Sequence, residues 1–140
     1  MCKRGEVYFC DLEPEPYGHE QGGMRPVVIL QNNTGNRYSP TVIVACMTRA
    51  DKHNIPTHVT IPNAEFIKYK ERLKYPNSLI MLEQIRTIDK RRLSTYLGKI
   101  PEEYMTKIDK ALAISVGLVS LNWKENHLWE NYWKERVYSR

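Results

Sequence analysis

The sequence contains few residues that can hold a metal ion or a redox centre. Its 140 residues include three cysteines, Cys2, Cys10 and Cys46, which are too scattered for a Cys-x-x-Cys motif. The four histidines lack the spacing of zinc ligands, so we expect no structural metal. An odd number of cysteines is typical of a reducing compartment, and we therefore expect a cytoplasmic protein.

Long apolar runs and the common cofactor motifs are also missing. No apolar run reaches the length of a membrane span, so we expect no membrane partner. The chain has no Walker loop, Rossmann fingerprint, nucleophile elbow or metalloprotease helix. Its chemistry would then need no metal or cofactor, and would rest on hydrogen bonds and fixed charge around a phosphate. A net charge of +5 and a pI of about 9.1 also favour a phosphate-bearing partner.

Short apolar segments separated by turns predict a mainly β protein. A length of 140 residues suits one domain with a core of its own. We expect strands at 7–11, 27–31, 41–47, 57–61, 78–88 with a bend near Glu83, and 96–100. Strong turn residues occupy 32–36, and 89–93 is a short basic connector. Many short strands with frequent turns favour a barrel or a small sandwich.

The end of the chain changes to a helical period. Pro101 stands where a first helical residue would, and the pattern predicts a helix at about 102–116 that ends before Gly117 and packs on the barrel. From Asn122 a second, amphipathic helix follows, which contains all three tryptophans. One of its faces carries Leu128, Trp129, Tyr132, Trp133 and Val137. We divide the chain into 1–120, the barrel with its helix, and 121–140, an aromatic helical extension.

A polar, glycine-bearing loop at 19–25 precedes the buried apolar run at 27–30. It delivers Arg25, whose planar fork matches phosphate oxygens, although a surface salt bridge to Glu20 is the alternative. His19 titrates near neutrality and can act as acid or base, or can simply be exposed. Thr48 follows another buried strand and can either bond a reacting oxygen or cap the strand end.

The stretch 83–87 alternates as a strand does. Alternation places Gln84 and Arg86 on one face and Glu83, Ile85 and Thr87 on the other. A face with Gln and Arg can bind bases and phosphates, or can be a solvated sheet surface. Basic residues are also interleaved with aromatic ones between Phe66 and Tyr75, namely Lys68, Lys70, Arg72 and Lys74. That mixture suits single-stranded nucleic acid, and equally a solvated helix or loop.

Several of these blocks together resemble the MazF/PemK family of toxin endoribonucleases. The likeness runs from about Lys3 to Leu118. The blocks that carry it are Arg4-Gly5-Glu6-Val7-Tyr8 with Asp11-Leu12, the loop His19-Glu20-Gln21-Gly22-Gly23-Met24-Arg25-Pro26-Val27, the stretch from Asn36 to Ala45 with Thr48, and Leu82-Glu83-Gln84-Ile85-Arg86-Thr87-Ile88-Asp89. Their order along the chain makes the resemblance specific.

The resemblance implies a fold, a reaction and partners. The fold would be a small SH3-like or CcdB-like β-barrel that forms a homodimer, here with an extra C-terminal aromatic helix. The activity would be sequence-specific cleavage of single-stranded RNA without a metal or cofactor. The 2′-hydroxyl would attack the neighbouring phosphate and leave a cyclic phosphate and a free 5′-hydroxyl. The usual partner is a cognate antitoxin whose disordered tail blocks the RNA groove.

The resemblance also implies roles for single residues. Arg25 and Thr48 match the catalytic pair, and Gln84 and Arg86 match the RNA-facing strand. Because arginine is a poor general base, a separate base is wanted, and Glu20, His19 and Glu83 are the candidates. We therefore expect the catalytic group to be Arg25, Thr48, Glu20 and His19. The expected RNA-binding group is Gln21, Gln84, Arg86, Thr87 and Glu83.

Three parts of the chain depart from the family pattern. Met81 stands where the PemK branch carries an arginine, the segment between Ile61 and Ser78 is longer than usual and basic, and the tail lies outside the family core. An exposed aromatic face would be unusual on a soluble protein, so we expect the tail helix to dock by its tryptophans. It would dock on its own barrel, the dimer mate or the antitoxin, the first two being favoured because an unpartnered toxin must stay soluble.

Two other functions remain open at this point. The similar CcdB barrel is a non-enzymatic poison that binds a topoisomerase. A barrel that had lost catalysis would bind RNA with the salt dependence of phosphate contacts and leave it intact. The Arg25 loop, Thr48 and the Arg86 strand favour cleavage over both.

Overall fold

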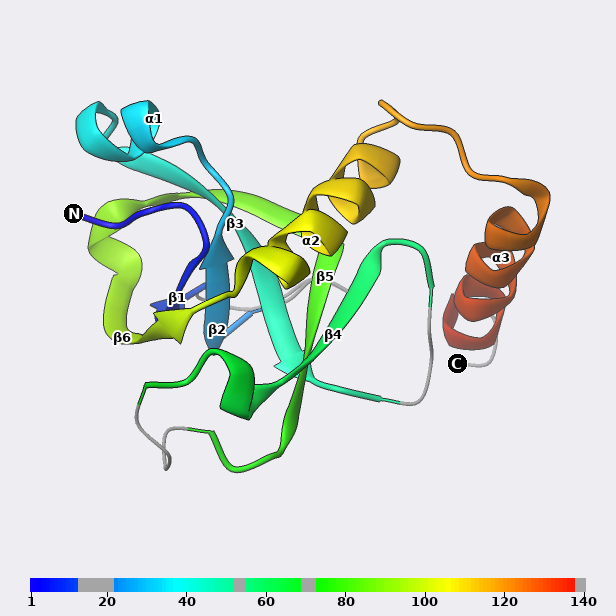
Figure 1. Cartoon of the computed structure of the whole chain (residues 1–140), viewed down its shortest axis with the longest axis horizontal. Coiled ribbons are helices and arrows are strands. Elements are labelled where there is room, and N and C mark those ends of the chain that lie inside the picture. The colour runs from blue at the N-terminus through cyan, green and yellow to red at the C-terminus, as the bar shows by residue number, and fades with distance from the viewer. Residues whose placement is uncertain (13–21, 52–54, 69–72, 138–140) are drawn as a thin grey trace.

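In the described part of the chain, six strands form one antiparallel sheet in the order β4-β5-β3-β2-β1-β6 (Figure 1). The structure is a computed structural model that describes residues 1–12, 22–51, 55–68 and 73–137, with the backbone alone for 135–137. The strands are β1 (Glu6–Asp11), β2 (Met24–Ile29), β3 (Thr41–Arg49), β4 (His58–Pro62), β5 (Asn77–Asp89) and β6 (Leu93–Lys99). The remaining elements are helices α1 (Asn33–Tyr38), α2 (Glu102–Ser115) and α3 (Trp123–Val137), and 3-10 helices η1 (Asn63–Glu65) and η2 (Lys90–Arg92). The predicted mainly β class with C-terminal helices is confirmed.

The sheet is curved but not closed by hydrogen bonds. Strands β4 and β6 are its edges, and among the described residues no ladder joins them. An isolated bridge between Ile67 and Gly98 brings the segment after β4 against β6. A Cβ atom at Gly98 would lie 1.7 Å from the carbonyl oxygen of Phe66, so this close approach requires glycine. The predicted barrel is therefore an open one.

Alternating residues build two apolar layers on opposite faces of the sheet. Val28 and Met47 belong to the layer that packs against Met105, Ile108 and Ala111 of α2. The opposite layer contains Cys2, Cys10, Leu12, Val27, Ile29, Val42, Val44, Cys46, Leu79, Met81 and Ile88. This double burial explains the continuous apolar run at 27–30, since neither face of β2 meets water there.

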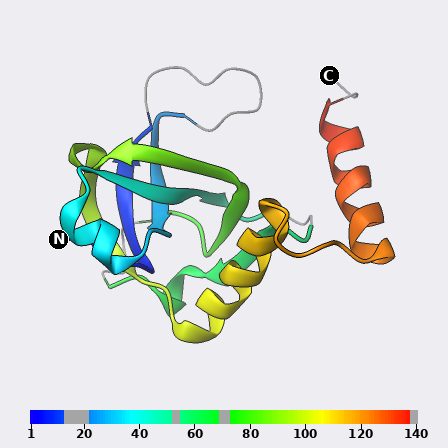
Figure 2. The same ribbon diagram turned by 90° about the horizontal axis from the view of Figure 1, so that it is seen from above.

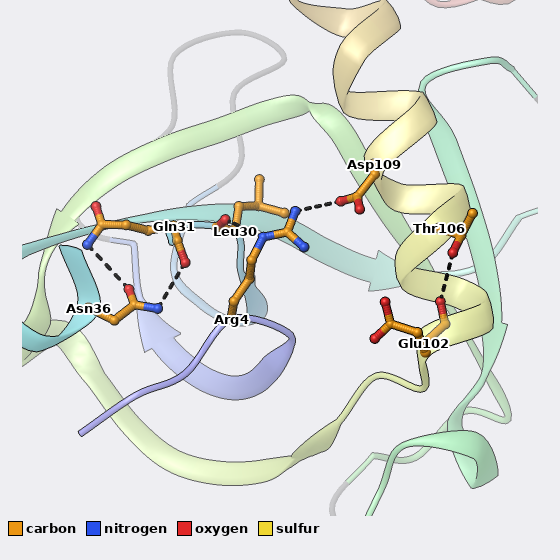
Figure 3. A network of polar contacts seen from close by, with 7 residues as sticks. All are labelled: Arg4, Leu30, Gln31, Asn36, Glu102, Thr106 and Asp109. Carbon is orange, nitrogen blue, oxygen red and sulfur yellow. Dashed lines mark hydrogen bonds and ion pairs between the residues drawn. The ribbon is translucent and has the colours of Figure 1, made fainter. Parts of the chain in front are cut away.

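Helix α2 lies along one face of the sheet (Figures 1 and 2). It begins at Glu102 as predicted, and the extended Pro101 serves as its N-cap and not as its first helical residue. Arg4 ties the helix to the sheet, since its Nε atom donates to the Leu30 carbonyl at 2.9 Å and its Nη2 atom lies 2.5 Å from Asp109 Oδ1 (Figure 3). Gly117, with φ of +79°, follows the helix and supports the predicted stop.

The predicted turn at 32–36 is instead the start of helix α1. The Asn32 side chain accepts a hydrogen bond from the Gly35 amide at 2.8 Å and caps the helix. Asn36 is fully buried and donates to the Gln31 carbonyl at 2.9 Å (Figure 3). The same turn-forming residues therefore act as a helix cap and a buried anchor.

Helix α3 stands at the C-terminal end of the molecule, after an extended segment that follows α2 (Figures 1 and 2). The predicted helix is confirmed over Trp123–Val137, and Tyr132, on its predicted apolar face, is buried. Tyr132 is 9% exposed, whereas Trp123 is 81% exposed. The Tyr132 ring contacts the His58 ring edge-on, with 5.2 Å between the ring centroids. Trp133 packs on Tyr132, and Val137 has no described side chain. Tyr132 therefore joins α3 to strand β4 of the sheet.

None of the described helices combines the length and the apolar character that crossing a bilayer requires.

Candidate functional site

Arg25 and Thr48 lie together where β2 begins and β3 ends. The Nη1 atom of Arg25 donates a hydrogen bond to Thr48 Oγ1 at 3.1 Å, and its Nε atom donates to the Gly22 carbonyl at 3.2 Å. Gly23 turns the chain before β2 with φ of +74°. The sequence predicted a loop at 19–25 and a strand from 27. The strand instead begins at Met24, so Arg25 and Pro26 belong to β2. Two strands therefore fix the position of this arginine.

The strand register places Arg25, Thr48 and Arg86 on the same face of the sheet. Val27 of β2 pairs with Cys46 of β3. Arg25 lies two residues before Val27, and Thr48 lies two residues after Cys46. Val44, two residues before Cys46, pairs with Arg86. Directly paired residues and residues two apart on a strand share a face. This face is the one opposite α2, with Val27, Val44 and Cys46 buried beneath the polar groups.

The charged groups of Arg86 and Arg25 act on the buried thiol of Cys46. Burial raises the pKa of the Cys46 thiol to about 11, while the guanidinium groups of Arg86 and Arg25 act in the opposite direction. The thiol is therefore neutral at physiological pH. Both arginines therefore place positive charge near the same buried thiol, and Glu83 places negative charge there.

Arg86 and its neighbours occupy the exposed end of β5. Arg86 Nη1 donates to the Leu12 carbonyl at 2.9 Å and so holds the end of β1. Ile85 packs against the layer under α2, so Ile85 and Arg86 lie on opposite faces as predicted. Thr87 is exposed opposite Ile43, and Gln84 is half-buried.

Glu83 forms a pair with His58 that the sequence did not predict. Its Oε1 atom lies 2.6 Å from His58 Nε2, and the two side chains are 13% and 1% exposed. The ladder between β3 and β5 is irregular here: Cys46 pairs with Met81, whereas Ala45 pairs with Ile85. The three β5 residues between these partners break the predicted alternation, and this irregularity lets Glu83 reach β4.

A pocket of about 400 Å³ opens beside the Arg25–Thr48 pair. Its other lining residues are Phe9, Met24, Pro26, Arg49, Leu73, Lys74 and Tyr75. Lys74 and Tyr75 come from the segment in which basic residues are interleaved with aromatic ones. The structure therefore brings part of that segment to the predicted catalytic pair.

The remaining expected site residues are not all described. His19, Glu20 and Gln21 lie outside the described residues. Within 1–12, 22–51, 55–68 and 73–137, no cluster of three or more His, Cys, Asp or Glu side chains is placed to hold a metal ion. Arg25, Thr48 and Arg86 share a face, Glu83 is engaged by His58, and Thr87 and Gln84 occupy the same strand as Arg86.

Comparisons with known proteins identify relatives of this chain. Residues 3–116 match the family described as PemK-like, MazF-like toxin of type II toxin-antitoxin system. The chain is similar to an endoribonuclease from a Mycobacterial species, solved in complex with its cognate antitoxin, at 30% identity and a TM-score of 0.63, over 86% of this chain and 100% of that one. It also resembles MazF from Deinococcus radiodurans at 23% identity and a TM-score of 0.65, over 83% and 96% of the two chains. The Mycobacterium tuberculosis toxin MazF-mt6 matches at 19% identity and a TM-score of 0.63, over 84% and 99%.

Proposed function

Since the chain belongs to the PemK-like, MazF-like toxin family of type II toxin-antitoxin systems, we propose that it is an endoribonuclease toxin that cleaves single-stranded RNA without a metal ion. The observation that carries this proposal is the hydrogen bond between Arg25 and Thr48 on the face that also holds Arg86. A guanidinium fixed beside a hydroxyl suits a phosphate with developing charge.

In the proposed reaction, the 2′-oxygen of one nucleotide attacks the adjacent phosphorus. The bond from the 2′-oxygen to phosphorus forms, the bond from phosphorus to the 5′-oxygen breaks, and the products are a 2′,3′-cyclic phosphate and a free 5′-hydroxyl. Negative charge grows on the phosphoryl oxygens as five bonds form around phosphorus. Arg25 would stabilise that charge, and the Thr48 hydroxyl would hold one phosphoryl oxygen in place.

The reaction also needs a group that takes the 2′-hydroxyl proton and one that supplies a proton to the 5′-oxygen. An arginine is a poor base because its side chain stays protonated. We assign the proton transfers to His19 and Glu20, which precede Arg25 in the chain by a few residues. Glu83 is less suited to that role because its carboxylate already contacts His58 at 2.6 Å. We propose that Glu83, Gln84, Arg86 and Thr87, together with Gln21, contact the RNA.

The same proposal includes the partners of the toxin. We propose a homodimer that works in the cytoplasm and is blocked by a cognate antitoxin, as the solved relative binds its own antitoxin. The catalytic unit would be 1–120, and 121–140 would be an addition to it, since the family match ends at residue 116.

The direct test is incubation of the purified protein with single-stranded and duplex RNA in the presence of a chelator. We expect cleavage of the single strand alone, because an A-form duplex does not let the 2′-oxygen align with the leaving group. The ends should be 5′-hydroxyls and cyclic phosphates. Activity that requires magnesium would overturn the mechanism. Binding without cleavage would favour a plain RNA-binding protein, and neither binding nor cleavage would favour a topoisomerase poison.

A further inference from the structure

The segment that precedes β5 forms a wall beside the Arg25–Thr48 pair. Leu73, Lys74 and Tyr75 line the pocket of about 400 Å³ that contains this pair. The same three residues line a second pocket of about 630 Å³ on the side of η1, together with Ala64 and Ile67. Because the two pockets share these residues, they are neighbours with Leu73–Tyr75 between them.

Buried hydrogen bonds hold this wall in a fixed position. Asn63 is 6% exposed, and its Nδ2 atom donates to the Tyr75 carbonyl at 2.6 Å. The Asn63 amide donates to the Pro76 carbonyl at 2.8 Å. Ser78 is fully buried, and its Oγ atom donates to Asn63 Oδ1 at 2.5 Å. The backbone of Tyr75 is therefore anchored to the interior by Asn63 and Ser78.

The lining of both pockets suits a strand of phosphates and bases. Arg25, Arg49, Lys68 and Lys74 contribute positive charge, and none of the described lining residues is acidic. Thr48 and Asn63 are the neutral polar residues of the two linings, and the other lining residues are apolar or aromatic. Positive charge combined with aromatic side chains suits single-stranded nucleic acid, because the charge contacts phosphates and the rings stack on bases.

The Tyr75 ring stays neutral under physiological conditions. Burial raises the pKa of its phenol, and the nearby Ser78 hydroxyl and Arg25 guanidinium only partly offset that effect. A neutral ring can lie against a base without bringing negative charge near the phosphate.

We propose that Tyr75 separates two nucleotide subsites of the RNA groove. Its ring stacks on the base next to the phosphate held by Arg25, Lys74 neutralises the following phosphate, and the pocket beside η1 receives the next nucleotide. This assignment rests on the proposed function for its substrate. It makes Tyr75 and Lys74 determinants of sequence preference, supplied by the segment between Ile61 and Ser78.

The test uses the full-length protein and 2′-O-methyl RNA heptamers, which lack an attacking hydroxyl and cannot be cleaved. A single 2-aminopurine, whose fluorescence falls on stacking, is moved along the heptamer. With wild type, one position should be quenched more than the others. Tyr75→Ala should remove that quenching and weaken binding about five- to 150-fold, which corresponds to one stacked base. Tyr75→Phe keeps the ring and should retain both.

Matched variants separate the subsites from general effects. Tyr38→Ala removes an exposed tyrosine on α1 and should change neither quenching nor affinity. Lys74→Ala should lower the salt dependence of binding by about one phosphate contact, whereas Lys99→Ala on β6 should not. Ala64→Trp fills the pocket beside η1 and should change the preferred base at one position only.

The outcomes for the subsites and for the proposed reaction are distinct. Wild-type protein that binds and quenches the heptamers but cleaves no RNA would overturn the reaction and leave the subsites standing. Wild-type protein that cleaves RNA, with Tyr75→Ala equal to it in quenching, affinity and cleavage pattern, would overturn the subsites.

Discussion

Arg25 donates a hydrogen bond from Nη1 to Oγ1 of Thr48 across 3.1 Å, and this contact joins the start of β2 to the end of β3. Neither residue is part of the buried apolar layers of the sheet. Removing either side chain should therefore affect chemistry at the pocket much more than folding.

Arg25→Ala and Arg25→Lys should both lower the rate of RNA cleavage. Loss of one preorganised charge at a developing oxyanion costs about 10²–10³ in rate, and lysine lacks the planar fork that contacts Thr48 and a phosphate together. Rates should be compared with thermal unfolding of each variant. The control is Arg37→Ala, an exposed arginine on α1 at the opposite end of β2 and β3. Cleavage near the wild-type rate by either Arg25 variant would remove this residue from the mechanism.

Thr48→Val should slow cleavage about tenfold or more with little change in melting temperature. Valine keeps the shape of the side chain but cannot bond Arg25 or a phosphoryl oxygen, and a hydrogen bond to a charged group contributes about 1.5–3 kcal/mol. Thr60→Val is the matched control, because Thr60 is an exposed threonine on strand β4. Equal losses of stability and rate would show that Thr48 acts as a structural cap.

The Arg25–Thr48 face could be predicted because it depends on short-range patterns. Buried runs predict where β2 and β3 lie, and the period of two predicts that Ile85 and Arg86 face opposite ways. The family resemblance names the residues, but the strand register is what brings them together. Strand β2 begins at Met24, before the predicted start at 27, because Pro26, a residue that is rare inside sheets, pairs with Phe9.

The contacts of Glu83, Tyr75 and Tyr132 could not be predicted, because each joins segments far apart in the chain. Glu83 meets His58 only because the β3–β5 ladder loses its regular register, and no local pattern predicts such an irregularity. Tyr75 is placed by Asn63 from a different element. The residue types at 32–36 are as common in turns as at helix caps, so the local sequence does not decide between the two. Here they form the cap and first turn of α1, in which Asn36 is buried.

Glu83→Ala should destabilise the protein by about 1–3 kcal/mol, since it leaves a buried histidine nitrogen without its partner. Glu103→Ala, at an exposed position on α2, should change stability by less than about 0.5 kcal/mol. Chemical denaturation of His58→Ala, Glu83→Ala and the double variant gives the coupling energy of the pair. Additive effects would show that the two side chains do not depend on each other, and a loss of RNA binding without loss of stability would leave Glu83 as an RNA contact alone.

Arg86→Ala should weaken RNA binding and flatten its salt dependence. A cation that contacts one phosphate contributes about one unit to the slope of log affinity against log salt. Gln84→Ala should instead change the preferred sequence if the amide contacts a base edge. Affinities measured across a salt series, and cleavage patterns on a long RNA, separate the two. Arg91→Ala is the control. The Arg91 guanidinium is exposed and paired with Asp89, away from the face that holds Arg25, Thr48 and Arg86. Unchanged affinity and preference in both variants would make this strand face a solvated surface.

Tyr132→Ala should release helix α3 from the sheet while leaving the Arg25–Thr48 pocket active. Burial of an aromatic side chain of this size contributes about 1.5–3 kcal/mol, and Tyr132 is the aromatic that meets His58. All three tryptophans lie on α3, so tryptophan fluorescence reports this helix alone, and its emission should shift to the red in the variant. Trp123→Ala, at a side chain 81% exposed, should leave stability within about 0.5 kcal/mol of wild type.

Deletion of the residues after Ser120 extends the same argument. The deletion uncovers His58, whose side chain is 1% exposed. It should lower the free energy of unfolding by about as much as Tyr132→Ala does, or loosen the dimer. Cleavage under conditions where the shortened chain is folded should stay near wild type, because the pocket lining contains no residue of α3. Wild-type emission typical of fully water-exposed tryptophan, shifting to the blue only when antitoxin is added, would show that α3 binds the partner and not its own sheet.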